Sequence, residues 1–173
     1  CAFLHCTHLD ELDLTGVISI GDSAFQSSFG QTASLKKVTL GPGLKSIGAS
    51  AFLDCRVLEE VIGLENTQIT KINNRTFEHS GLKTVHIPAA VTSIGDYAFC
   101  AYISSNTSWA SGTVSGQTAT GTPVQALTAV YIPEDSQLQT IGKYAFQNCA
   151  ALEKIVLPEK IRSLGVRVFK NCA

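Results

Sequence analysis

The sequence has little net charge and no long apolar segment. Thirteen lysines and arginines face 14 aspartates and glutamates, which gives no basic footprint for nucleic acid or for an anionic membrane surface. No apolar run approaches the ~20 residues of a membrane span. Tryptophan occurs once, at Trp109. These properties argue against nucleic-acid binding and against membrane insertion of this segment.

Catalytic signatures are missing as well. The sequence contains no Gly-x-Ser-x-Gly elbow, no His-Glu-x-x-His and no phosphate-binding glycine loop. The four histidines occupy different positions of the repeat described below, and the spacing assigns no shared acidic partner to them. We therefore expect a protein that is not an enzyme and that needs no cofactor or metal.

What the chain does contain is a repeat. Phenylalanine recurs with spacings of 22, 27, 25, 22, 47 and 23 residues, almost always after a small residue. An Ile or Leu lies five residues before each Phe except the first, and it is followed by Gly in five cases and by Asn73 in one. The repeated phenylalanines are Phe3, Phe25, Phe52, Phe77, Phe99, Phe146 and Phe169. A period in the low twenties indicates a solenoid, whose open faces make binding the expected function.

The segment from Leu82 to Phe99 illustrates one unit. Val85 and Ile87 alternate with His86 and predict a short strand with an inward apolar face. A second inward stretch ends at Ile94, and we expect Gly95 to turn the chain with a positive φ. In the unit that begins at Leu58, one extra residue before Leu64 predicts a β-bulge.

The complete unit reads Leu-x-x-Val-x-Ile-Pro…Val-x-x-Ile-Gly-x-x-Ala-Phe-x-x-Cys. It resembles the BspA-like leucine-rich repeat over nearly the whole chain except residues 101–126. The resemblance implies a right-handed leucine-rich-repeat solenoid, with a parallel sheet on one face and short helical or irregular turns on the convex side. It also implies an extracellular or cell-surface module for adhesion or interaction. We expect a single array over residues 1–173, which begins and ends within a repeat and so belongs to a longer protein or has trimmed ends.

Four of the six cysteines fit the repeat. Cys6, Cys55, Cys149 and Cys172 lie three residues after a repeat Phe, where Ser28 and Ser80 stand in other units. We interpret this slot as a small buried side chain, and regard a disulfide between Cys149 and Cys172 as possible but not required. A zinc site formed by Cys1, His5, Cys6 and His8 is the alternative for the N-terminal cysteines, and we do not favour it because the spacing matches no usual set of ligands.

Residues 101–126 interrupt the array. This stretch is rich in Ser, Thr and Gly and carries Trp109. A degenerate repeat is one interpretation, but we favour a protruding loop or hairpin because the core motif is missing. Trp109 either anchors a partner or, as we favour, folds back on the solenoid.

Outward positions of the first strand form two columns. One mixes charges; the other runs from Asp13 and Thr39 to four apolar or aromatic residues, Ile62, His86, Tyr131 and Val156. These four and Trp109 are our candidates for contact with a protein or glycan partner on a host surface or matrix. Ordinary β propensity explains the same residues. The alternative function is a structural spacer within a larger surface protein.

Overall fold

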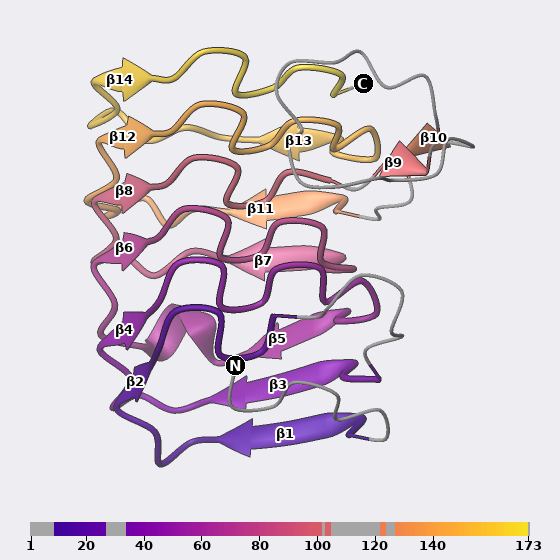
Figure 1. Cartoon of the computed structure of the whole chain (residues 1–173). Coiled ribbons are helices and arrows are strands. Elements are labelled where there is room, and N and C mark those ends of the chain that lie inside the picture. The colour runs from indigo at the N-terminus through magenta and orange to yellow at the C-terminus, as the bar shows by residue number, and fades with distance from the viewer. Residues whose placement is uncertain (1–8, 27–33, 102, 105–121, 124–126, 173) are drawn as a thin grey trace.

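The computed structural model describes residues 9–26, 34–101, 103–104, 122–123 and 127–172. Six coils follow one another, and each contributes two short strands (Figure 1). The first strands are β1 (Glu11–Leu14), β3 (Lys37–Leu40), β5 (Glu60–Ile62), β7 (Thr84–His86), β11 (Ala129–Tyr131) and β13 (Lys154–Ile155). The second strands are β2 (Ser19–Ile20), β4 (Ser46–Ile47), β6 (Lys71–Ile72), β8 (Ser93–Ile94), β12 (Thr140–Ile141) and β14 (Ser163–Leu164). The predicted solenoid is confirmed.

Strands of successive coils pair in parallel. The first strands form two sheets, ordered β1-β3-β5 and β13-β11-β7. The second stretch, expected only to face inward, also forms parallel sheets, ordered β2-β4 and β14-β12-β8-β6. The two sets of arrows run in opposite directions across the coil in Figure 1. Equivalent residues pair, as Val85 does with Val130 and Ile94 with Ile141, so the repeat sets the register.

The core is one ladder of equivalent side chains. Phe52, Phe77, Phe99 and Phe146 are fully buried. Neighbouring rings lie 5.0–5.6 Å apart from Phe25 to Phe169, with interplanar angles of 4–12°. This spacing follows the separation of hydrogen-bonded coils. Because no single coil covers its own ring, stability comes from the contacts between coils.

The turn segment runs from the Gly after the second strand to the third residue after the Phe, and its peptide groups hydrogen-bond from coil to coil. The Phe52 N–H donates to Thr76, the Phe77 N–H to Ala98, and the Phe99 N–H to Ala145, at 2.8–2.9 Å. Each acceptor carbonyl belongs to the peptide unit whose N–H makes the next bond. We call such a series a peptide file. Two further files run in the same direction, one through Ser50, Arg75 and Tyr97 and the other through Asp54, His79 and Ala101.

The expected positive φ at Gly95 is wrong. Positive φ falls two residues later, at Tyr97 (57°), and again two residues after the Phe, as at His79 (59°). Gly95 is needed for a different reason: a Cβ there would lie 2.6 Å from the backbone nitrogen of Asn74 in the preceding coil. The glycine therefore permits close stacking of coils rather than a special backbone conformation.

The expected bulge near Leu64 is also wrong. Strand β5 keeps a regular register with β3 through Ile62, which pairs with Thr39. The extra residue lies beyond the strand, where Gly63 (φ 79°) leads into η1 (Leu64–Asn66), a 3₁₀ helix. A left-handed Gly and a 3₁₀ turn absorb the added length without disturbing the ladder.

The insertion begins and ends in a two-stranded antiparallel pair. Strand β9 (Ile103–Ser104) pairs with β10 (Thr122–Pro123). Residues 105–121, which include the candidate Trp109, lie outside the described residues.

Candidate functional site

The outward column of the first strands brings three of the predicted residues together. His86 pairs directly with Tyr131 across β7 and β11, and their rings stack with centroids 4.5 Å apart at 19°. Val156 follows β13, the next strand of this sheet. Tyr131 is 52% exposed and Val156 61% exposed. Large apolar side chains left this open on a β face are suited to contact with a partner.

Ile62 does not join this group. It is 44% exposed, but it pairs with Thr39 in the other first-strand sheet, and no strand pairing joins β5 to β7 among the described residues. The break falls in the coil that carries Gly63 and η1. The strand pairing is thus interrupted between β5 and β7, although the Lys83 N–H still donates to the Glu59 carbonyl oxygen across this boundary. The larger part of the predicted stripe lies on the sheet of β7, β11 and β13.

A groove of about 810 Å³ lies over this part of the sheet. His86, Tyr131 and Val156 line it together with Glu65, Pro133 and Lys154. The lining combines the aromatic pair, the branched apolar side chain of Val156, and charged side chains of both signs. Such a surface can stack a planar or sugar ring and hydrogen-bond polar groups around it.

The turn segments carry a second aromatic column that sequence reasoning missed. Tyr97 and Tyr144 stack with centroids 4.9 Å apart, and the Arg75 guanidinium lies 5.1 Å from the Tyr97 ring centre. Arg167 Nη1 lies 3.5 Å from the Tyr144 hydroxyl oxygen. All four residues stand two positions before a repeat Phe, so alignment of the units on Phe could have revealed the column. Its rings cover one another, which leaves edges and hydroxyl groups for contact.

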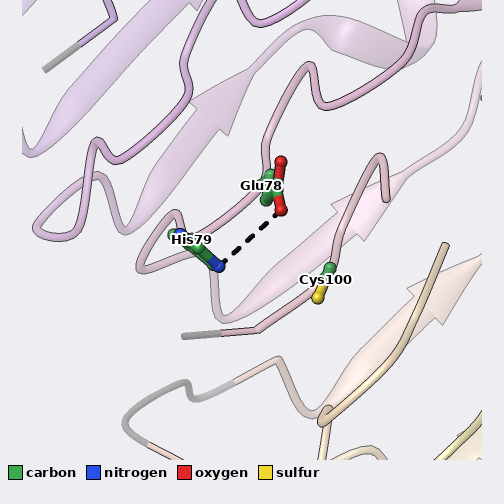
Figure 2. A group of neighbouring side chains, drawn as sticks. All are labelled: Glu78, His79 and Cys100. Carbon is green, nitrogen blue, oxygen red and sulfur yellow. Dashed lines mark ion pairs between the residues drawn. The ribbon is translucent and has the colours of Figure 1, made fainter. Parts of the chain in front are cut away.

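A polar cluster lies in the turn segments that follow Phe52, Phe77 and Phe99. It consists of Asp54, Glu78, His79 and Cys100, and Figure 2 shows the last three. His79 Nδ1 is 3.1 Å from Asp54 Oδ1, and His79 Nε2 is 3.8 Å from Glu78 Oε1. The repeat spacing assigns no shared acidic partner to the histidines, whereas the structure shows two carboxylates beside His79. Cys100 lies beside this pair, and one ligand atom each from Glu78, His79 and Cys100 fall within 4.8 Å of one another. Glu78 and Cys100 occupy the slot after a repeat Phe and His79 the slot after that.

The carboxyl groups of this cluster differ in pKa. Burial raises the pKa of Glu78, and the charges of His79 and Arg75 offset only part of that effect. Burial also acts to raise the pKa of Asp54, but the hydrogen bond and charge of His79, together with Arg56 at 3.3 Å, outweigh it and leave the pKa lowered. The environment therefore favours the ionised form of Asp54 and disfavours the ionised form of Glu78.

The repeated cysteines serve the core. Cys149 is buried and its thiol lies 3.3 Å from the Phe99 carbonyl oxygen of the preceding coil. Cys172 makes the same contact with Phe146 at 3.1 Å. Cys149 and Cys172 are not joined by a disulfide. The residues of the zinc site that we do not favour, Cys1, His5, Cys6 and His8, lie outside the described residues.

Comparison with known proteins places this geometry in context. Among the described residues, no helix is long and apolar enough to cross a membrane. The sequence matches the BspA type leucine-rich repeat region in six copies, over residues 1–105 and 123–173. No curated protein matches the sequence.

Solved structures share this fold, and two of them are similar over most of this chain. The pneumococcal vaccine antigen PcpA is 21% identical, with a TM-score of 0.69 over 94% of this chain and 38% of its own. A leucine-rich cell surface protein of Faecalibacterium prausnitzii A2-165 is 23% identical, with a TM-score of 0.62 over 94% of this chain and 45% of its own. The chain thus spans less than half the length of either structure. With its six-fold match and its stacked Phe core, the chain belongs to the BspA-type leucine-rich repeat family.

Proposed function

We propose that this chain is a non-catalytic extracellular or cell-surface module that binds a protein or glycan through the groove over β7, β11 and β13. The observation that carries the proposal is the exposed stack of His86 on Tyr131, with Val156 beside it in the groove. A stack of two rings presents a rigid surface, so little side-chain entropy is lost when a partner covers it.

The similar structures support a surface location. One is described as a vaccine antigen and the other as a leucine-rich cell surface protein. A surface protein that repeats an open sheet offers a long face for recognition, which is the common use of solenoid architecture. The proposal extends that use to this chain.

The alternative is a structural spacer that holds another domain away from the cell. Exposed Ile, Tyr and Val are ordinary strand residues, and the charged column formed by Glu11, Lys37 and Glu60 is what a spacer would present. Binder and spacer differ in what happens when Tyr131 is removed.

The test uses the full chain on a glycan array and on a panel of purified extracellular-matrix proteins. The binding proposal expects at least one specific partner whose affinity falls by about tenfold or more in Tyr131→Ala and in His86→Ala, because central aromatic contacts carry much of the binding energy. Thr39→Ala, at the equivalent strand position of the other sheet, should bind like the wild type. Trp109→Ala tests the insertion separately. Specific binding that survives both groove substitutions would overturn the groove as the binding surface. No binding on either panel would favour the spacer.

A further inference from the structure

The polar cluster of Glu78, His79 and Cys100 has the composition of a metal site. It offers one carboxylate oxygen, one imidazole nitrogen and one sulfur, all within 4.8 Å of one another. Figure 2 shows the three side chains on neighbouring turn segments. Oxygen, nitrogen and sulfur donors in this combination suit Zn²⁺.

The histidine is oriented for such a role. Its Nδ1 lies 3.1 Å from Asp54 Oδ1, a carboxylate that Arg56 holds in place at 3.3 Å. An Nδ1–H donated to Asp54 leaves the Nε2 lone pair on the side of Glu78, whose Oε1 is 3.8 Å away. Carboxylate–imidazole pairs of this kind fix the tautomer and orientation of metal-binding histidines.

Glu78 and Cys100 are both buried and carry donor atoms that a cation can use. Glu78 is 6% exposed, and its Oε2 accepts no hydrogen bond, although Arg75 Nη1 lies 3.4 Å away as an ion pair. A divalent ion beside Glu78 and Cys100 would stabilise both the carboxylate and the thiolate.

The fold itself does not require these residues. In the coil of Phe146, the slots of Glu78 and His79 are filled by Gln147 and Asn148. Asn148 has the same left-handed backbone (φ 65°) as His79 (φ 59°). A buried carboxylate beside an imidazole is therefore a special feature of one coil and not a demand of the turn segment.

The backbone holds the ligands in register. The His79 N–H donates to the Cys100 carbonyl at 2.8 Å, within one of the peptide files. Ligand atoms around tetrahedral zinc lie roughly 3.3–3.8 Å apart, so side-chain rotations that close the cluster by about 1 Å would complete the geometry. We propose that Glu78, His79 Nε2 and Cys100 Sγ bind Zn²⁺, with Asp54 positioning the imidazole and a fourth coordination position open to water.

Co²⁺ is the probe, because a cobalt–thiolate bond gives a near-ultraviolet charge-transfer band. We expect the full chain to bind one equivalent of Co²⁺ with that band, and Zn²⁺ to displace it. Cys100→Ser should abolish the band. Glu78→Gln and His79→Asn, which copy the residues of the Phe146 coil, should weaken Zn²⁺ binding by more than tenfold. Asp54→Asn should weaken it by about 10–100-fold, the usual effect of removing a carboxylate that orients a ligand.

The control variant is Cys6→Ser with His8→Asn, which removes a thiol and an imidazole from the N-terminal segment. It should bind Co²⁺ like the wild type. Far-ultraviolet circular dichroism of each variant shows whether it folds. If one variant does not fold, the remaining variants still test the proposal. The proposal is overturned if no Co²⁺ binds, if the band persists in Cys100→Ser, or if it disappears in the N-terminal control.

Discussion

The thiol of Cys55 lies 3.0 Å from the carbonyl oxygen of Phe25, one coil back, and donates a hydrogen bond to it. Cys149 and Cys172 repeat this relationship with Phe99 and Phe146. Ser80 stands in the same slot, yet its buried hydroxyl makes no hydrogen bond. The longer carbon–sulfur bond reaches the carbonyl of the preceding coil, and the shorter carbon–oxygen bond of serine does not.

Exchange of the two residue types should therefore have opposite effects. We expect Ser80→Cys to increase the free energy of unfolding by about 1 kcal/mol, because it replaces a buried unsatisfied hydroxyl with a bonded thiol. Cys55→Ser should decrease it by a similar amount. Urea denaturation of the reduced proteins measures both. Destabilisation by Ser80→Cys would show that volume, and not hydrogen bonding, governs the slot.

Alanine substitution of the turn glycines should show whether a glycine is needed for close contact between coils or for its backbone conformation. In Gly95→Ala the new Cβ would meet the Asn74 backbone at 2.6 Å, so we expect a loss of at least about 2 kcal/mol from overpacking. Gly21 has no described atom within 4 Å of its hypothetical Cβ. Gly21→Ala should be neutral, or stabilising by up to about 1 kcal/mol through the unfolded state. Equal losses in thermal denaturation would refute the explanation from coil contact.

The ring stack should be most sensitive in its middle. Phe77 is fully buried between Phe52 and Phe99, and Phe77→Ala should cost about 3–5 kcal/mol. Phe169 is only partly buried and stacks on Phe146. Phe169→Ala should therefore cost clearly less, measured by chemical denaturation under the same conditions. A reversed order would mean that the stack is not the continuous core described above.

The buried thiols should make stability fall at alkaline pH. Burial raises the pKa of Cys149 well above its usual value, and that of half-buried Cys172 less strongly. The folded state therefore keeps protons that the unfolded state releases above about pH 8.5, and the free energy of unfolding should decrease as pH rises through that value. Cys149→Ser should show a smaller decrease between pH 8 and pH 10 than the wild type. Peptide mapping after alkylation at pH 8 should find Cys172 modified before Cys149; the reverse order would contradict this assignment.

The repeat made most of the architecture predictable. Phe spacing and the Ile five residues earlier identify positions that stack in the structure, as Ile94 does on Ile141 and Phe77 on Phe99. Period-2 alternation around His86 also located its outward direction correctly. These features follow from side chains that recur at fixed positions, and such patterns are visible in the amino-acid sequence alone.

Features that depend on the neighbouring coil were not predictable in the same way. The sequence suggests that Gly95 turns the chain. Glycine is required there because the Asn74 backbone of the preceding coil leaves no room for a Cβ. Asp54 and His79 are 25 positions apart and both stand two residues after a repeat Phe, but only the stacking of their coils shows that the two side chains meet. The strand pairing that ends at β5 and resumes at β7 is interrupted in the coil that carries the 3₁₀ helix η1. Each of these features needs the relative placement of two coils, which a single unit does not encode.

The peptide files have an electrostatic consequence for the whole array. Their amide groups all point the same way from coil to coil, as they do along an α-helix, so each dipole polarises the next. Every coil added to a file should strengthen the bonds already in it. Shortening such an array should therefore cost more than the contacts of the coil removed, and we expect cooperativity to grow with the number of coils.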